Sequence, residues 1–449
     1  MPYFPNTPDD RQEMLRAIGA ASIEELFAMV PAGLRLGRYL DLPPAMGEME
    51  LTAHMTGLAR RNTPAGQGAC FLGGGSYDHF IPAVVDFVAS RSEFYTAYTP
   101  YQAEASQGTL QAIFQYQTLL TQLTGMDISN ASLYDGASAA AEAVLMAVSS
   151  TRRDGRVVVA GSVHPEYRQV LATYLANSPT ELVTVAAPQG TVSPEEIQAA
   201  VDDRTACVLL EHPNFFGCLE QVEAAAEIAH AAGALLVVAV DPISLGLLKR
   251  PGDCGADIVV AEGQPLGIPM SFGGPYLGML ACREKSLRRM PGRIVGQTTD
   301  RRGKRCFVLT LQTREQHIRR EKATSNICTD EALMALRASV YLAAMGPKGL
   351  RGVAELCLHK ARYAAERLGA LDGWQLAFDR PTFKEFVVRR TGGGIEQLVE
   401  AAAAEGIFAG VPLAPWYPEL SDCLLVAVTE KRTKEEIERL AAFFENAAP

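Results

Sequence analysis

The middle of the chain alternates between short continuous apolar runs and longer segments with helical spacing. The continuous runs fall at 157–160, 182–185, 206–210 and 235–240, and each predicts a strand buried on both faces. Segments near 165–175, 194–201 and 220–232 separate them and carry apolar residues at helical intervals. This alternation predicts an α/β fold with a mostly parallel sheet and right-handed helical crossovers.

The pattern changes on both sides of this region. Residues 1–65 predict a helical N-terminal arm, because Thr7 and Ser22 precede helix-like segments as N-caps do, and a further helix is expected from Gly47 to Arg60. Such an arm either packs on its own domain or embraces a partner subunit. Residues 66–328 then form the large α/β domain. Residues 329–449 form a smaller α+β C-terminal domain, with strand-like runs at 385–389 and 423–428.

A candidate ligand site lies in the stretch 235–280. Asp241 directly follows the run 235–240, and ligands bind at the carboxyl ends of strands in open α/β sheets. A second strand, 257–261, leads into Glu262-Gly263-Gln264-Pro265 and a glycine-rich segment. This order resembles pyridoxal-phosphate enzymes of the aspartate aminotransferase-like fold, the type I transferases. In that fold an aspartate pairs with the cofactor's ring nitrogen, and a lysine on the next connection forms the Schiff base.

In this chain Gln264 stands at the expected position of the Schiff-base lysine. Its amide nitrogen is not nucleophilic and cannot form an imine. The nearest lysines, Lys249 and Lys285, do not fall on the required corner between strand and loop. The sequence therefore predicts the frame of a cofactor site without its covalent anchor, and no catalytic residue in this chain.

Two other positions belong to the same degenerate site. Ser138 lies at the start of a helix of small residues, where backbone amides could hold a phosphate, although small residues also let a helix approach a sheet closely. His164 follows the first strand, where the fold often places a ring over the cofactor, and a hydrogen-bonded loop histidine is the alternative. The glycines at 73–75 favour a tight surface turn over a loop that edges a pocket.

A tyrosine-rich loop precedes a helix that is expected to end at Gly125. Ring-bearing and polar side chains of this kind either cover a core or edge a ligand site. The candidate residues are Tyr95, Tyr98, Tyr101, Gln102, Glu104, Ser106 and Gln107.

A basic stretch at 301–322 suits either an anionic partner surface or a seam between subunits, with a solvated charged face as the alternative. Its basic residues are Arg301, Arg302, Lys304, Arg305, Arg314, Arg319, Arg320 and Lys322.

The composition narrows the class of protein. The net charge of −10 over 449 residues disfavours nucleic-acid binding, which needs a basic field. The nine cysteines form no CxxC pairs, so neither a metal site nor a disulfide framework is expected. The first thirty residues show no targeting pattern, and no stretch is typical of a membrane span. A cytoplasmic protein is expected.

Four motifs together resemble one family. They are YTPYQAEASQG at 98–108, EGQPLGIPMSFGGPYLG at 262–278, MPGRIVGQTTD at 290–300 and LQTREQHIRREKATSNICT at 311–329. The chain resembles, over nearly its whole length, the first-half subunits of split glycine dehydrogenases (decarboxylating), the P-proteins of the glycine cleavage system.

The resemblance implies an enzyme that works only as a heteromeric complex. Pyridoxal phosphate would be bound covalently by the partner, glycine dehydrogenase subunit 2 (the β subunit), and glycine would be decarboxylated there. The aminomethyl group would pass to the lipoyl arm of the H-protein. This chain would complete the walls of the partner's active site, with the tyrosine-rich loop at its edge.

Two alternatives remain open at the level of the sequence. A self-sufficient pyridoxal enzyme would need a lysine at position 264, and Gln264 argues against it. A structural or regulatory protein on a retired pyridoxal-enzyme fold would bind neither cofactor nor H-protein.

Overall fold

The computed structural model describes residues 6–447 and falls into two units, Met1–Thr63 and Pro64–Pro449. The first unit contains helices α1 (Pro8–Ala17), α2 (Ile23–Leu26) and α3 (Glu48–Ala59). The predicted start of α1 is confirmed, because Thr7 and Asp10 form a reciprocal capping box. The helix expected from 47 to 60 is confirmed as α3. None of these three helices contains a buried residue.

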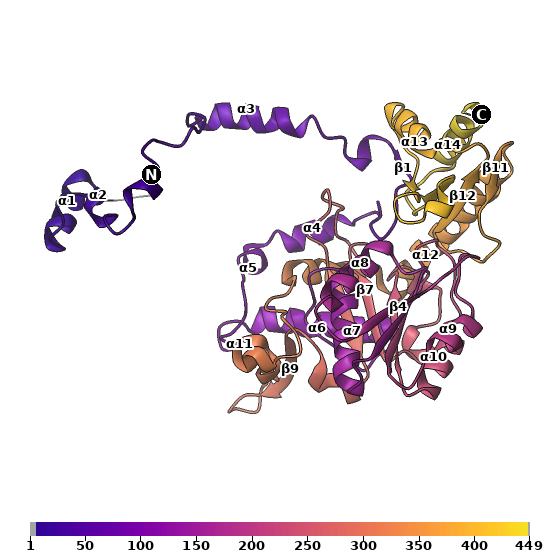
Figure 1. Cartoon of the computed structure of the whole chain (residues 1–449), viewed down its shortest axis with the longest axis horizontal. Coiled ribbons are helices and arrows are strands. Elements are labelled where there is room, and N and C mark those ends of the chain that lie inside the picture. Colours follow the sequence, from indigo (N-terminus) through magenta and orange to yellow (C-terminus); the bar gives the residue numbers. More distant parts are fainter. Residues whose placement is uncertain (1–5, 448–449) are drawn as a thin grey trace. The chain divides into compact units, whose positions relative to one another are not determined.

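The second unit is built on a seven-stranded sheet with the order β2-β8-β7-β6-β5-β3-β4. Figure 1 labels two of its strands, β4 and β7. Strands β7, β6, β5, β3 and β4 run parallel, whereas β8 is antiparallel to β7 and β2 to β8. The predicted, mostly parallel sheet is confirmed. Its strands are β2 (Ile128–Ser129), β3 (Arg156–Ala160), β4 (Glu181–Val185), β5 (Thr205–His212), β6 (Leu235–Val240), β7 (Ile258–Glu262) and β8 (Gly278–Cys282).

Helices connect and cover these strands. Pro165 at the first helical position and the apolar spacing that follows produce α8 over the predicted residues. Gly125 ends α6 in the left-handed conformation, as expected. The helices of this part are α4 (Ala83–Ala89), α5 (Ser92–Tyr95), α6 (Gln107–Thr124), α7 (Gly136–Thr151), α8 (Pro165–Leu175), α9 (Pro194–Ala200) and α10 (Val222–Ala231).

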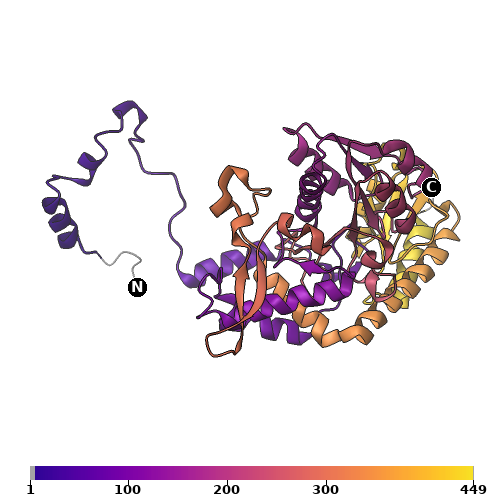
Figure 2. The same ribbon diagram turned by 90° about the horizontal axis from the view of Figure 1, so that it is seen from below.

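The remaining elements include one hairpin that the sequence did not predict. Strands β9 (Ile294–Thr299) and β10 (Arg305–Thr310) pair only with each other, and α11 (Gln316–Arg319) follows them. The long helix α12 (Ala332–Gly369) bends at Gly346, which precedes Pro347, and leads to the C-terminal elements (Figure 2).

The C-terminal part forms a second, four-stranded sheet with the order β11-β12-β15-β14. Its strands are β11 (Trp374–Leu376), β12 (Glu385–Arg390), β14 (Val411–Pro412) and β15 (Cys423–Ala427), and its helices are α13 (Ile395–Ala404) and α14 (Lys434–Asn446). A short strand from the start of the unit, β1 (Ala69–Cys70), pairs with β13 (Ile407–Phe408). Among the described residues, no helix combines the length and apolar character that crossing a membrane requires.

Candidate functional site

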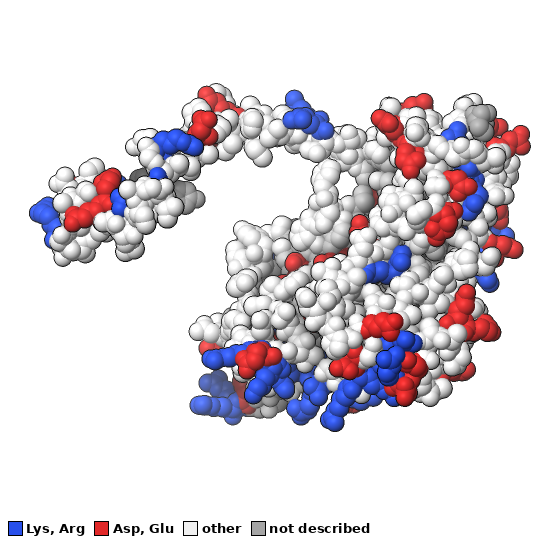
Figure 3. Space-filling model, viewed as in Figure 1, with Lys and Arg blue, Asp and Glu red and all other residues white. Residues whose placement is uncertain are grey.

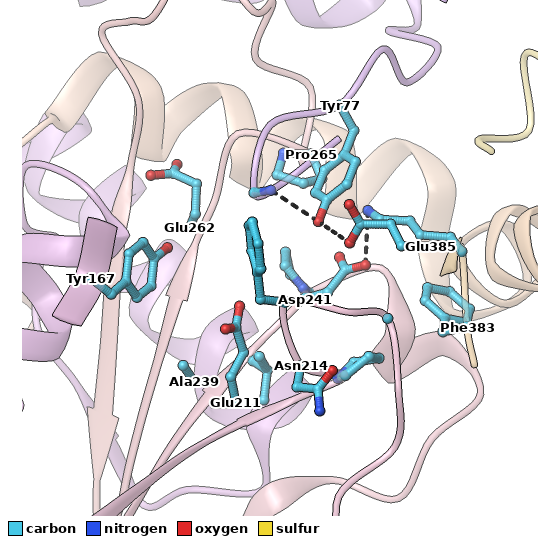
Figure 4. A pocket seen from close by; sticks show the side chains of 17 residues that line it. Tyr77, Tyr167, Glu211, Asn214, Ala239, Asp241, Glu262, Pro265, Phe383 and Glu385 are labelled. Carbon is cyan, nitrogen blue, oxygen red and sulfur yellow. Dashed lines mark hydrogen bonds and ion pairs between the residues drawn. The ribbon is translucent and has the colours of Figure 1, made fainter. Parts of the chain in front are cut away.

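The site lies at the carboxyl ends of β5, β6 and β7, where the sequence predicted it (Figure 4). Asp241 follows β6 and Glu211 lies near the end of β5, so both carboxylates reach the same cavity. The C-terminal part adds Lys384 and Glu385, and the loop before α4 adds Tyr77. The cavity has a volume of about 30 Å³. That is room for roughly two water molecules, far below the ~300–1,000 Å³ of typical ligand sites.

Asp241 does not have a free carboxylate for a ring nitrogen. The Lys384 Nζ atom lies 2.8 Å from an oxygen of Asp241, and Lys384 is only 1% exposed. The same amine lies 3.3 Å from the centre of the Tyr77 ring. A cation from the C-terminal part therefore holds the position beside Asp241 that a cofactor's ring nitrogen would need.

Gln264 is held by hydrogen bonds rather than left free. Its Oε1 accepts from the Tyr77 backbone N–H at 2.9 Å, and its Nε2 donates to the Tyr77 carbonyl at 3.0 Å. Nε2 also donates to the Ile268 carbonyl at 2.8 Å. With 2% exposure, the amide is buried and its donors and acceptor are satisfied. The side chain joins the loop of Tyr77 to the loop that follows β7.

Two carboxylates of the chain accept hydrogen bonds from backbone amides in the first turn of α7. Asp135 caps the helix and accepts from the Ser138 N–H at 2.8 Å and from the Ser138 hydroxyl at 3.1 Å. Glu262 accepts from the Gly136 N–H at 3.0 Å. A Cβ atom at Gly136 would lie 2.0 Å from the Tyr167 hydroxyl, so only glycine fits beneath that ring. The Gly136 and Ser138 amides, which could hold a phosphate, are therefore already bonded to carboxylates.

His164 takes part in packing at the same edge. Its Nε2 lies 2.7 Å from the Gly74 carbonyl, and its ring stacks on Tyr167 with centroids 4.9 Å apart. Its backbone N–H donates to Glu211 at 2.6 Å. Burial is the main cause that lowers the pKa of His164, so the neutral ring is favoured. The ring holds the loop of Gly74 and Gly75 against the cavity.

Several buried acids surround the cavity. Burial raises the pKa of Glu211 to about 8 and that of Glu385 to about 7. Burial likewise raises the pKa of Glu262 to about 7, against the three backbone N–H groups that it accepts from. The Tyr77 hydroxyl donates to Glu385 at 2.8 Å (Figure 4). The site is a hydrogen-bonded cluster that proton uptake can change, with no room for a ring.

A possible metal-binding group adjoins this cluster, formed by His79, Cys357 and Glu430. Its atoms are already joined, because His79 Nδ1 lies 2.6 Å from Glu430 and the Cys357 thiol 3.5 Å from the same oxygen. The Lys384 amine lies 3.1 Å from His79 Nε2, and burial raises the pKa of Cys357. A neighbouring cation and a protonated thiol favour a hydrogen-bonded cluster over a metal site.

The tyrosine-rich loop lies elsewhere in the second unit. Tyr98 is 82% exposed, whereas the Tyr101 ring packs edge-on against His317 and beneath the Arg293 guanidinium. Gln107 bonds both the N–H and the carbonyl of Phe307 in β10. Among the described residues, none of the seven loop candidates lines the cavity. These are Tyr95, Tyr98, Tyr101, Gln102, Glu104, Ser106 and Gln107.

Sequence reasoning placed Asp241, Ser138, His164 and Gln264 at one site. In the described structure Asp241 lines the cavity, whereas the other three contact residues near it: Gln264 bonds to Tyr77, His164 to Gly74 and Ser138 to Asp135. Sequence reasoning missed the groups that close the site, namely Tyr77, Lys384, Glu385 and Tyr167. The surface turn predicted at 73–75 is wrong, because Gly75 lines the cavity. As these residues lie, they do not fit a pyridoxal phosphate molecule.

Comparison with solved structures defines the class of protein. The fold is that of a Burkholderia pseudomallei sphingosine-1-phosphate lyase, with a TM-score of 0.66 and 16% identity over 93% of this chain and 94% of the other. It is also that of a cysteine desulfurase from Escherichia coli, with a TM-score of 0.64 and 14% identity over 87% of this chain and 98% of that one. The architecture is therefore the type I fold of pyridoxal-phosphate enzymes, as predicted.

The particular family follows from closer matches. The model of the glycine cleavage system P-protein family matches residues 1–444, and the chain belongs to this family. It is 55% identical, over 98% of its length and 99% of the relative's, to a probable glycine dehydrogenase (decarboxylating) subunit 1 from Desulforamulus reducens. A crystal structure of an inhibitor-bound glycine decarboxylase (P-protein) superimposes with a TM-score of 0.90 and 43% identity, covering 99% of this chain and 100% of that one. The family resemblance drawn from the four motifs is confirmed.

Proposed function

We propose that this chain is the lysine-lacking subunit of a two-chain glycine decarboxylase. The observation that carries the proposal is the filled site. Gln264 is hydrogen-bonded to Tyr77, and Lys384 forms an ion pair with Asp241. A family that decarboxylates glycine needs a site where pyridoxal phosphate supplies an electron sink. A chain of this family with no room for the cofactor is therefore best understood as a subunit that supports a site on its partner.

The partner in this proposal is glycine dehydrogenase subunit 2, which binds pyridoxal phosphate covalently through its own lysine. Glycine is the substrate, and the lipoyl-carrying H-protein accepts the aminomethyl group. We further propose the cytoplasm as the compartment. Support comes from the nine cysteines, which are all free in the described structure.

The contribution of this chain is to shape and shield the partner's site. The loop from Tyr95 to Gln107 is proposed as the edge of that site. It is fixed at one end by the two Gln107 bonds to Phe307 and in its middle by the Tyr101 ring, while Tyr98 extends into solvent. Rigid phenol rings close a small pocket at low entropic cost and exclude water from a reacting centre.

The decisive experiment is reconstitution. The purified chain is mixed with subunit 2 and pyridoxal phosphate. The complex is reduced with borohydride, and the labelled peptides are identified by mass. Glycine decarboxylation is measured in parallel. We expect activity only with both chains, and the pyridoxyl label only on subunit 2. A pyridoxyl-lysine in this chain would overturn the assignment. Failure of the two chains to associate would instead favour a structural or regulatory protein on a retired fold.

A further inference from the structure

The charge of this chain is distributed very unevenly. Residues 288–322 contain eleven lysines and arginines but three acids, Asp300, Glu315 and Glu321, within a chain of net charge −10. Arg293 pairs with Asp330. Within residues 6–447, the other ten basic side chains make no ion pair. These ten are Arg288, Arg289, Arg301, Arg302, Lys304, Arg305, Arg314, Arg319, Arg320 and Lys322.

The turn of the β9–β10 hairpin, which we call the basic hairpin tip (residues 300–305), displays four of them. Its one acid is used internally, because Asp300 accepts from the Arg302 N–H at 2.8 Å and from the Lys304 N–H at 2.9 Å. The tip is exposed throughout. Lysines and arginines gather around α11 and this hairpin at the lower left of the body in Figure 3. Because Asp300 bonds to the backbone of the turn, the four basic side chains of the tip are exposed without an ion-pair partner among the described residues.

A groove of about 550 Å³ adjoins the hairpin, between it, α6 and the first half of α12. Its apolar surface is formed by Phe114, Phe307, Leu336 and Val340, with the two phenyl rings 5.2 Å apart. Amide side chains also line it, namely Gln111, Gln115, Gln122 and Gln297. Arg305 lines the same groove, so the charged tip and the apolar surface are continuous.

We propose that the basic hairpin tip and this groove dock an acidic protein surface. The inference rests on the proposed function, under which the acidic surface belongs to the mobile carrier, the lipoyl-bearing H-protein, and not to subunit 2. Opposite charge steers a carrier to its site and allows rapid exchange, whereas a permanent subunit interface is typically larger and more apolar. The Gln-lined groove lies beside the basic hairpin tip. It offers apolar contacts and amide hydrogen bonds to the adjoining part of the docked acidic protein.

Nucleic acid is the less favoured polyanion. The chain is acidic overall, and a nucleic-acid surface normally belongs to a basic domain. Aromatic side chains in the groove pack against each other or beneath Arg305 rather than standing free for bases.

The test compares two charge-matched double variants, each assembled with subunit 2. Arg301→Glu with Arg302→Glu alters the hairpin tip. Lys348→Glu with Arg351→Glu alters exposed positions on α12 and changes the net charge by the same amount. We expect the hairpin variant to raise the KM for H-protein by about tenfold or more, with kcat within about twofold. Its KM should also respond less to salt than that of the unaltered complex. The α12 variant should keep both constants.

Several outcomes would overturn the proposal. They are an unchanged KM in the hairpin variant, an equal rise in the α12 variant, and loss of assembly with subunit 2, which would assign the tip to a subunit seam. Tight binding of duplex DNA that the hairpin variant abolishes would assign it to nucleic acid. Direct binding of H-protein to the chain is measured separately from activity. A complex that fails to decarboxylate glycine would contradict the proposed function, but it would leave the docking result unaffected.

Discussion

Gln264 joins two loops through hydrogen bonds that a lysine at the same position could not make. The amide both donates to and accepts from the backbone of Tyr77, which a lysine cannot do because its ammonium group only donates. We propose that this amide stands where a catalytic chain of the fold would carry its Schiff-base lysine.

Gln264→Lys is expected to destabilise the chain by about 2–4 kcal/mol without creating a cofactor link. The Tyr77 N–H would lose its acceptor, and a cation would be buried at a position with 2% exposure. Urea unfolding measures the loss, and borohydride reduction with pyridoxal phosphate tests for a link. Gln264→Met, which removes the hydrogen bonds without adding charge, is the control and should lose less. A stable Gln264→Lys variant that accepts the pyridoxyl label would contradict this account.

Glu211 is expected to make stability depend on pH. Burial raises its pKa from 4.5 to about 8, so between these values the folded chain holds a proton that the unfolded chain has released. Stability from this group is present below the unfolded pKa and is lost as pH rises through the folded pKa. Glu211→Gln keeps an acceptor for the His164 N–H but cannot titrate.

The unfolding free energy of the unaltered chain should therefore fall more steeply across this window than that of Glu211→Gln. The difference in slope should approach ~1.4 kcal/mol per pH unit. Urea unfolding at several pH values provides the measurement. Parallel curves for the two proteins would show that Glu211 is ionised in the folded state.

At the scale of elements, two tyrosines of the tyrosine-rich loop differ in their contacts. Tyr101 lies beneath Arg293 and beside His317, whereas Tyr98 is 82% exposed. If the loop edges the partner's site, at least one of Tyr98→Phe and Tyr101→Phe should keep assembly and cofactor absorbance yet lose glycine turnover by about tenfold, or ~1.4 kcal/mol.

The matched control for this experiment is Tyr174→Phe, on the surface of α8 and 40% exposed. It should leave turnover unchanged. If both loop variants also turned over glycine at the normal rate, the hydroxyl groups would have no role in the reaction, and the loop would only cover the core.

Elements with local signals were predictable from the sequence. β6 and α8 fall on their predicted residues, because a continuous apolar run and a proline at the first helical position act within the segment itself. The β9–β10 hairpin was not predictable, because its charged turn resembles a solvated loop and its strands pair only with each other.

The strand ends that carry the site were predictable from the sequence. The side chains that fill the site from other parts of the chain were not. Asp241 and Gln264 lie at strand ends that the pattern locates. Lys384 and Tyr77 reach the same cavity from distant parts of the chain, and only tertiary packing brings a cation to Asp241. The glycines at 73–75 were misjudged for the same reason, since their contacts are with His164 and Glu385.

At the scale of the whole molecule, the part of Pro64–Pro449 with the seven-stranded sheet is bonded to the part with the four-stranded sheet. Asp78 pairs with Lys431 at 2.6 Å and with Arg432 at 3.0 Å, and the Tyr417 hydroxyl donates to the Gly161 carbonyl at 2.9 Å. Large buried clusters support each sheet. This unit has the cores that it needs to fold by itself.

Removing residues 1–63 should therefore leave the unfolding free energy of the remainder nearly unchanged while weakening assembly with subunit 2. The arm helices bury none of their residues, yet they expose large apolar side chains such as Phe27, Leu51 and Met55. Such surface indicates an interface. We expect the dissociation constant, measured by sedimentation, to rise by about tenfold or more.

Leu51→Gln with Met55→Gln in the full chain is the matching point variant and should act in the same direction. An arm deletion that unfolded the remaining unit, or one that assembled normally, would show that the exposed side chains serve another purpose.

The ion pair of Lys384 with Asp241 also bears on how this chain can change over evolutionary time. Reopening the site would require removing Lys384, freeing Gln264 from Tyr77 and withdrawing the carboxylates from α7, and each step alone leaves a buried group without its partner. Intermediates on that path would be selected against before any activity returned. If this chain is the lysine-lacking subunit proposed above, the site is thus expected to stay filled, and the chain would remain dependent on a partner that carries the lysine.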